Sequence, residues 1–342
     1  MPLERRLLDQ QIQTETGKRT GVLRIAREAT PPGIHRIIAI GEVMRVENHG
    51  LQIHLAETHG NRMLEHVRIL RWVMLEYWPS EILEFLHHPT QAEKLSGGLT
   101  GRAVHRVTLE DRNVVVKANV APREAAFYRN FAPVLNANGV RTPKLEMIAE
   151  TGDETWLVIE HIPNLLPKKR WLADPQVLET LRRLHEFKFD HAPELAFRPT
   201  WTQAMNAHAL QFLPKHLEEK LEDFRALAQP LLEPRNLISG DPNPMNWGVL
   251  ENGEPVLFDW DRFGLGSPTL DLAITVPGLG SRNDYEKVAT TYLGKPDTAL
   301  TREIALAKVW VIVDVLGHVK ETLVHEQLQP FLESIPNWLE QV

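Results

Sequence analysis

The sequence predicts an α+β protein in which antiparallel strands come first and helices follow. Residues 95–160 hold short alternating or apolar runs separated by turn residues, which is the pattern of strands. After residue 163 the apolar residues recur mostly at helical spacing. Asn252-Gly253, between two apolar runs, indicates a hairpin with a two-residue turn inside this second part. The change near residue 163 is therefore the expected boundary between a strand-rich and a helical part.

Composition limits the class of protein. The chain has 342 residues, with 38 basic and 45 acidic side chains and a formal charge of −7, so a nucleic-acid partner is disfavoured. Cysteine is absent, which excludes disulfides, thiolate zinc sites and a cysteine nucleophile. No apolar run reaches the length of a membrane span, and the first residues lack the apolar core of a secretion signal. We expect a cytoplasmic protein with no membrane association.

Residues 1–90 are expected to form an ordered N-terminal extension. A short helix over 3–13 is followed by strand-like runs at 21–25, 34–45 and 51–55. Helical spacing over 61–78 and a further helix from Ser80 to Leu86 complete the extension. The simplest interpretation is a packing or dimerising appendage, which would make the protein a homodimer. The alternative is a lid or regulator of a neighbouring site.

A glycine-rich loop opens the strand-rich part. Gly97, Gly98 and Gly101 precede an alternating strand at 103–109, and a second strand returns over 113–117. Glycines let backbone amides approach phosphates where a side chain would collide. A glycine turn in an ordinary hairpin explains the loop without any ligand, so the loop gains meaning only from the residues that accompany it.

A lysine and a glutamate follow the loop at short spacing. Lys117 ends the second strand, and Glu124 lies in the first turn of a helix predicted over 123–135. Taken separately, they are a solvated lysine and a carboxylate favoured by the helix dipole. Taken together, they suit an ion pair that directs the ammonium toward nucleotide phosphates.

Two further strands, at 143–148 and 155–160, end the strand-rich part, and residues 161–164 form a connector. Helical spacing then recurs over 175–187, 202–213, 217–231, 284–293, 301–322 and 331–339. Asp314 stands in a nearly apolar run, so it is either a satisfied core carboxylate or a group facing a substrate cavity.

The most informative stretch runs from residue 238 to residue 261. Asp241 and Asn246 lie in a polar loop, and the far strand of the hairpin delivers Asp259. Local backbone thus brings two carboxylates and an amide together. Such a set suits magnesium and phosphates, because hard oxygen atoms bind the metal and a carboxylate can receive a hydroxyl proton. Asp271, near the start of the next helix, is expected to tie down this loop or to cap backbone amides.

In combination these motifs resemble the aminoglycoside phosphotransferase and choline kinase-like family, relatives of the protein kinases. The resemblance covers roughly residues 95–342. Its most specific parts are Ser239-Gly240-Asp241 through Asn246, Phe258-Asp259-Trp260-Asp261, and Gly266-Ser267-Pro268 to Asp271-Leu272-Ala273, with Arg123-Glu124-Ala125-Ala126-Phe127-Tyr128 as a secondary signature. It implies a bilobal, protein kinase-like fold. The N-lobe at 91–162 would be an antiparallel sheet plus one helix, the C-lobe at 163–342 would be mainly helical, and the nucleotide would lie between them.

The resemblance also implies residue roles. Contacts to ATP, or to GTP as the alternative nucleotide, would come from the glycine loop, the ion pair and the connector: Gly97, Gly98, Gly101, Lys117 with Glu124, and the backbone of Glu160, His161 and Ile162. Asp241 would orient the acceptor hydroxyl and take its proton. Asn246 and Asp259 would hold Mg²⁺. Asp261 would assist the metal site or a nearby basic group, and Asp261 and Asp314 are the candidate substrate residues.

The predicted function is therefore a Mg²⁺- and ATP-dependent kinase that phosphorylates a hydroxyl of a small molecule. An antibiotic, an amino alcohol, a sugar or another metabolite remain open as acceptors. A polycationic antibiotic needs an acidic pocket, for which the candidates are Glu218, Glu219, Glu222, Asp223, Asp284, Glu286 and Asp314.

Two other classes compete with this prediction. A nucleotide-binding regulatory protein of the same fold is suggested by the extension and by Ser239, where family members usually have histidine. This serine is expected to alter the bracing of the loop more than the chemistry. A protein kinase is disfavoured, because the interval from Asp259 to Asp271 leaves little room for a peptide-docking segment.

Overall fold

The computed structural model describes residues 7–12, 21–28, 34–39, 42–47, 50–52, 78–87, 89–95, 103–189, 193–318 and 329–342. The chain divides into two compact units, one made of Met1–Trp78 with Gly97–Gly101 and the other of Pro79–Ser96 with Arg102–Val342. The helix predicted over 61–78 and the glycine-rich loop lie outside the described residues.

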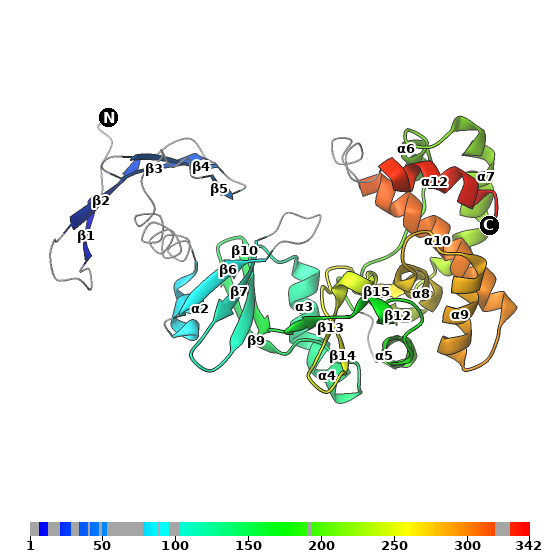
Figure 1. Ribbon diagram of the computed structural model, residues 1–342, viewed down its shortest axis with the longest axis horizontal. Helices are drawn as coiled ribbons and strands as arrows, with labels where there is room; N and C mark the ends of the chain where they lie inside the picture. The colour runs from blue at the N-terminus through cyan, green and yellow to red at the C-terminus, as the bar shows by residue number, and fades with distance from the viewer. Residues whose placement is uncertain are drawn as a thin grey trace. The chain divides into compact units, whose positions relative to one another are not determined.

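The first unit contains an antiparallel sheet whose five strands follow chain order (Figure 1). They are β1 (Leu7–Ile12), β2 (Gly21–Glu28), β3 (Ile34–Ala39), β4 (Glu42–Glu47) and β5 (Gly50–Gln52). The helix predicted over 3–13 is wrong for β1, because its backbone pairs with β2, and hydrogen bonds between strands override a weak local helix preference. The strand predicted over 34–45 is in fact the hairpin of β3 and β4.

A second antiparallel sheet, in the second unit, has the order β6-β7-β8-β10-β9. Its strands are β6 (Gln91–Lys94), β7 (Val104–Thr108), β8 (Asn113–Lys117), β9 (Leu145–Thr151) and β10 (Glu154–Glu160). The last four confirm strands predicted from the sequence. The predicted helix α2 (Ser80–Leu86) is also present and packs against β9. Lys117 ends the central strand β8, opposite Leu157 of β10.

The single helix predicted over 123–135 is broken in two. α3 (Pro122–Asn130) is capped by Phe131, and α4 (Ala132–Ala137) begins directly after this residue. Pro133 explains the break, because it has no backbone N–H with which to continue the hydrogen-bond ladder of α3. Figure 1 shows α3 beside the second sheet. This position brings the first turn of α3, and with it Glu124, next to the end of β8.

Two small sheets follow the connector. β12 (Asn236–Ile238) pairs with β15 (Gly264–Gly266), and β11 (Asn164–Leu165), β13 (Trp247–Val249) and β14 (Pro255–Leu257) form the other sheet. The predicted hairpin is β13–β14, but its turn is longer than predicted. Leu250 N donates to Glu254 O at 3.0 Å, which leaves three residues in the loop. Only Gly253 has a positive φ, +83°, whereas a two-residue type I′ turn would require one at Asn252 as well.

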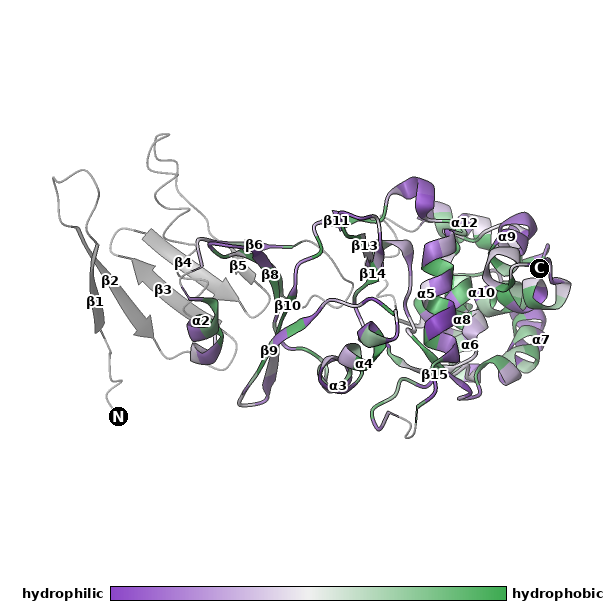
Figure 2. Cartoon of the chain, turned by 90° about the horizontal axis from the view of Figure 1, so that it is seen from below, coloured by the Kyte–Doolittle hydropathy of each residue, from purple (hydrophilic) through white to green (hydrophobic). Residues whose placement is uncertain are grey.

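The rest of the second unit is helical. Its α-helices are α5 (Pro175–Glu186), α6 (Gln203–Ala209), α7 (Glu218–Ala228), α8 (Pro268–Thr275), α9 (Arg282–Leu293), α10 (Thr298–His318) and α12 (Gln329–Leu339). α10 packs against α6, α7, α8 and α9 and is the most apolar long helix in Figure 2. One hydrophobic core runs from α3 through β12 to α10. Within the described ranges, no helix has both the length and the apolar character required to cross a membrane.

Candidate active site

The loop after β12 brings Asp241 and Asn246 together. The Asp241 carboxylate accepts hydrogen bonds from Asn243 Nδ2 at 2.9 Å and from Asn246 Nδ2 at 3.0 Å. Asn246 Nδ2 also donates to the backbone oxygen of Asp241 at 2.9 Å. The one-turn 3-10 helix Pro244–Asn246 reverses the chain between the two residues. Because Asn246 uses its nitrogen in these contacts, its amide oxygen is turned away from Asp241 and is the atom left to bind a cation.

Asp271, in the first turn of α8, anchors the start of the loop that carries Asp241. Its carboxylate accepts hydrogen bonds from Ser239 N at 2.7 Å and Gly240 N at 2.9 Å. Its side chain has no solvent exposure. His185 Nε2 donates to the same carboxylate at 3.1 Å, which assigns His185 Nδ1 as the acceptor from Tyr292 Oη at 2.9 Å. The structural role predicted for Asp271 is confirmed, whereas His185 was missed because it appears in the sequence only as one histidine in an amphipathic helix.

Ser239 and Gly240 are both adapted to their positions in the loop. The Ser239 hydroxyl accepts a hydrogen bond from Asp241 N at 3.3 Å, so the side chain at this position braces the loop. Gly240 has a φ of +80°, and a Cβ there would lie 2.2 Å from the backbone oxygen of Arg262. Only glycine allows this close approach. The backbone of Arg262 is therefore packed directly against the residue that precedes Asp241.

Asp259 follows β14 in an unusual backbone conformation. Its φ is +65°, which is rare for residues other than glycine and persists where the surroundings impose it. Those surroundings include Phe258, whose N–H donates to Asn246 O at 3.0 Å, and Trp260, whose buried ring stacks on Phe127 of α3 at 4.2 Å. The Asp259 carboxylate is 42% exposed and lies 3.3 Å from Lys117 Nζ. The hairpin thus delivers Asp259 to the end of β8.

Lys117 is held between two carboxylates. Its ammonium forms one ion pair with Glu124, which is fully buried, and a second with Asp259 at 3.3 Å. Burial opposes the charge on Lys117, but Glu124 and Asp259 outweigh this effect and raise the pKa of the ammonium above its ordinary value. Lys117 therefore stays charged, and the predicted contact with Glu124 is present.

The Asp241 carboxyl is a stronger base than an ordinary aspartate. Burial raises its pKa, and the negative charge of Asp259 adds to the effect. Hydrogen bonds from Asn243 and Asn246 and the positive charge of Arg262 oppose the increase. The structure thus contains a partly buried basic carboxylate within electrostatic range of both Asp259 and Arg262.

The donors at this site fit a hard divalent cation. The carboxylate of Asp259 and the amide oxygen of Asn246 are oxygen ligands of the kind that Mg²⁺ prefers. Among the described residues no three histidine, aspartate or glutamate side chains cluster as a metal cage. One carboxylate and one amide are enough protein ligands for Mg²⁺, because Mg²⁺ usually keeps several water ligands and takes further ligands from phosphates.

The connector joins the second sheet to the β13–β14 hairpin. Arg141 Nη2 binds both carboxylate oxygens of Glu160, at 2.9 and 2.8 Å, and the backbone N–H of Glu160 donates to Lys144 O. A Cβ on Gly248 of β13 would lie 2.4 Å from Ile162 Cγ2, so Ile162 is packed tightly on the hairpin. The Glu160 N–H is therefore already used within the sheet. Of the predicted nucleobase contacts, only its carbonyl and the backbone of His161 and Ile162 remain.

Arg262 pairs with Asp314 beside the loop. Arg262 Nη1 lies 2.6 Å from Asp314 Oδ2. The guanidinium lies 4.4 Å from the centre of the Phe197 ring and 5.8 Å from that of Trp310. The Asp314 side chain is only 9% exposed, which favours the interpretation of a satisfied, buried carboxylate. Arg262 was missed from the sequence, although its place directly after Asp261 was a usable signal.

Arg123 links α3 to two other segments. Its Nε donates to Leu195 O at 2.5 Å and its Nη1 to Asp261 O at 3.1 Å. The backbone of the predicted substrate residue Asp261 thus contacts α3, one residue before Glu124. The contact ties the position of α3 to the segment that follows Asp259.

Comparison with known proteins identifies the family. The model of the phosphotransferase enzyme family matches residues 91–303, more than half of the chain. No curated protein sequence matches it. The fold is similar to that of a thermostable mutant of aminoglycoside phosphotransferase APH(4)-Ia, with a TM-score of 0.57, 13% identity, and coverage of 79% of this chain and 98% of that one.

Two further structures share the fold. One is a thermostable mutant of the same phosphotransferase in a ternary complex with ADP and hygromycin B, with a TM-score of 0.53, 14% identity, and coverage of 76% and 97%. The other is choline kinase LicA from Streptococcus pneumoniae, with a TM-score of 0.51, 14% identity, and coverage of 81% and 100%. The predicted protein kinase-like, bilobal α+β fold is confirmed, and the chain belongs to the phosphotransferase enzyme family.

Proposed function

We propose that the chain is a Mg²⁺- and ATP-dependent kinase that transfers a phosphoryl group to a hydroxyl of a small molecule. The observation that carries the proposal is that an ion-paired lysine and a hydrogen-bonded aspartate both lie near Asp259. Lys117 Nζ lies between Glu124 and Asp259, and Asp241 is hydrogen-bonded to Asn246. A positive group for phosphates, oxygen ligands for a cation and a basic carboxylate are what phosphoryl transfer requires.

In this proposal each residue has one task. Lys117 binds nucleotide phosphates and Glu124 fixes the direction of the ammonium. Asn246 and Asp259 hold Mg²⁺, which when bound would neutralise charge on the phosphates. Asp241 orients the acceptor hydroxyl and receives its proton as the hydroxyl oxygen bonds to the γ-phosphorus and the bond from that phosphorus to the departing ADP breaks. The carbonyl of Glu160 and the backbone of His161 and Ile162 meet the nucleobase, and the three glycines of the loop cover the phosphates.

The structural neighbours add support for the nucleotide. The related aminoglycoside phosphotransferase has been seen with ADP and, in another complex, with AMP-PNP. We infer that ATP is the phosphoryl donor here, with GTP as the alternative to be tested. The nucleotide-binding regulator is the weaker proposal, because the lysine, both aspartates and the asparagine are all in place. The dimerising role of residues 1–90 remains a prediction.

The acceptor proposed here is a small metabolite of low positive charge. Several acidic residues that could have attracted a polycation are occupied within the protein. Asp314 pairs with Arg262, Glu222 pairs with Arg225, and Asp284 caps the start of α9. Arg262 also places a positive charge close to Asp241. With these acidic groups paired, the position offers less free negative charge to a polycationic antibiotic, and a sugar or an amino alcohol suits it better.

An ATP-consumption screen tests both parts of the proposal. The full chain is incubated with MgATP or MgGTP and with aminoglycosides, amino alcohols and sugars, and the phosphorylated product is identified by mass spectrometry. We expect turnover with a sugar or an amino alcohol and none without a divalent cation. Preferred turnover of an aminoglycoside would overturn the proposed acceptor class. Binding of MgATP with no turnover of any acceptor would favour the regulatory alternative.

A further inference from the structure

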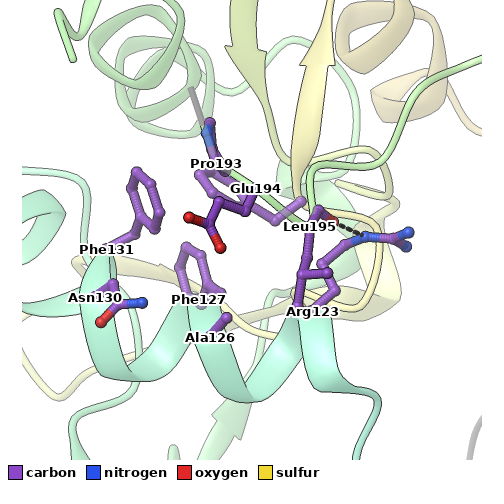
Figure 3. Close-up of a pocket in the computed structure, with 9 residues that line it drawn as sticks. Arg123, Ala126, Phe127, Asn130, Phe131, Pro193, Glu194 and Leu195 are labelled. Atoms are coloured by element: carbon purple, nitrogen blue, oxygen red, sulfur yellow. Dashed lines mark hydrogen bonds between the residues drawn. The ribbon is translucent and has the colours of Figure 1, made fainter. Parts of the chain in front are cut away.

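A cavity of about 340 Å³ lies on α3. None of the residues that line it has a role in the proposed phosphoryl transfer. One wall is α3 itself, with Arg123, Ala126, Phe127 and Asn130. The segment Pro193, Glu194 and Leu195 lies opposite α3, as Figure 3 shows, and Phe131 and Phe263 complete the lining. Its volume is at the lower end of the range of ligand pockets, which is roughly 300–1,000 Å³.

Three of the nine residues that line this α3 cavity are aromatic. The rings of Phe127 and Phe263 lie 4.8 Å apart in an edge-to-face arrangement, and those of Phe131 and Phe263 are 5.0 Å apart. Phe127 and Phe263 are almost fully buried, whereas Phe131 is partly exposed. An apolar or aromatic group entering the cavity would be stabilised by the removal of its surface from water.

One carboxylate is directed into the α3 cavity. Figure 3 shows the Glu194 side chain with its oxygen atoms above the Phe127 ring. Glu194 is exposed to solvent, and no ion pair or hydrogen bond joins its carboxylate to another of the residues that the structure describes. The nearest basic lining residue, Arg123, uses its Nε and Nη1 for the carbonyl oxygens of Leu195 and Asp261. Arg123 is therefore directed at backbone oxygen atoms and forms no ion pair with Glu194.

We propose that the α3 cavity binds a small organic cation, with its ammonium group beside Glu194 and its apolar or aromatic body against Phe127 and Phe131. The single carboxylate disfavours an anion. Phe127 is stacked on Trp260, so the partly exposed Phe131 is the ring that can favour a cation over a neutral molecule of the same shape, because ring faces attract positive charge. The small volume and the single acidic group disfavour a large polycation.

A ligand bound in this cavity would contact α3, the helix that carries Glu124. Arg123 and Phe127 flank Glu124 on α3, and Phe127 stacks on Trp260, the residue between Asp259 and Asp261. A ligand that bridges α3 and the segment 193–195 stabilises this arrangement. This second step rests on the proposed function: the cation and MgATP should increase each other's affinity by the same factor, as linkage requires.

The site is tested by titrating the full chain with three probes of similar shape: phenethylammonium, 2-phenylethanol and 3-phenylpropionate. Calorimetry or protein NMR measures the affinities. We expect phenethylammonium to bind best, with a dissociation constant of about a few millimolar, as suits a ligand of this size. Equal affinity for the three probes, or no binding of any of them, would overturn the proposal.

Substitution of the carboxylate locates the binding. Glu194→Gln should weaken phenethylammonium binding about fivefold, the scale of an exposed ion pair, and leave 2-phenylethanol unchanged. Glu303→Gln, which changes an exposed glutamate on α10, is the matched control and should change neither affinity. An unchanged affinity for phenethylammonium in Glu194→Gln would show that the cation binds elsewhere.

Coupling is measured by titrating MgATP with and without saturating phenethylammonium. A several-fold increase in MgATP affinity, lost in Glu194→Gln, supports the second step, and no change overturns it. If MgATP does not bind at all, the proposed kinase function fails. The probe titrations still decide whether the α3 cavity is a cation site.

Discussion

The Asp241 loop and the Lys117 ammonium lie in one candidate active site but are held by different kinds of interaction. The loop is fixed by buried hydrogen bonds from Ser239 and Gly240 to Asp271, a carboxylate with no exposure to solvent. Lys117 is fixed by ion pairs to Glu124 and Asp259, and Asp259 is 42% exposed. The loop should therefore be insensitive to salt and ligands, whereas the position of Lys117 should respond to changes of charge around it.

Removal of the proposed base should have the largest effect of all. Asp241→Asn keeps the size of the side chain but cannot accept the hydroxyl proton. We expect turnover to fall by about 10²–10⁴-fold, with MgATP affinity nearly unchanged. Steady-state kinetics and calorimetry measure the two quantities. A variant with normal turnover would show that another group takes the proton.

Loss of the loop anchor should appear mainly as a loss of stability. Asp271→Asn offers one acceptor oxygen where two buried N–H groups need one each. We expect the free energy of unfolding to fall by about 2–3 kcal/mol in urea titrations, together with a loss of turnover. Asp284→Asn, in the capping box of α9, is the control and should cost about 1 kcal/mol. Equal losses in the two variants would contradict the anchoring role.

Weakening of the ion pair should act mainly on the nucleotide. In Glu124→Gln the ammonium of Lys117 keeps a hydrogen-bond partner but loses one of its two charged partners. We expect MgATP affinity to fall about tenfold, because Lys117 is then drawn to Asp259. Calorimetry at two salt concentrations measures the change. If Glu124→Gln instead destabilised the protein as much as Asp271→Asn does, the distinction between the two regions would be lost.

The smallest expected effect is a shift in pH dependence. Asp241 acts as a base only when deprotonated, so turnover should rise as pH increases through its pKa, which burial raises above that of an ordinary aspartate. Arg262 opposes this increase. Arg262→Met should therefore move the acidic limb of kcat/KM to higher pH by a fraction of a unit. A shift to lower pH, or none, would mean that the Arg262 charge does not reach Asp241.

Much of the site could be predicted because its members lie close together in the chain or belong to ordered motifs. Asp241, Asn246 and Asp259 are joined by a short loop and a hairpin, so local backbone preferences bring them together. The hairpin was predicted, but the length of its turn was not, since the number of loop residues depends on strand register. Gly253 adopts the required positive φ in either turn.

The sequence alone determined that strands precede helices after residue 95, that cysteine chemistry is absent and which residues are candidates for the reacting groups, because periodicity and residue type are local properties. Tertiary structure alone decided that His185 supports Asp271, that Arg262 pairs with Asp314, and that residues 123–131 and 193–195 enclose the α3 cavity. These contacts join residues that are distant in the chain. No local preference encodes such distances, because burial and charge pairing are settled only when the whole core packs.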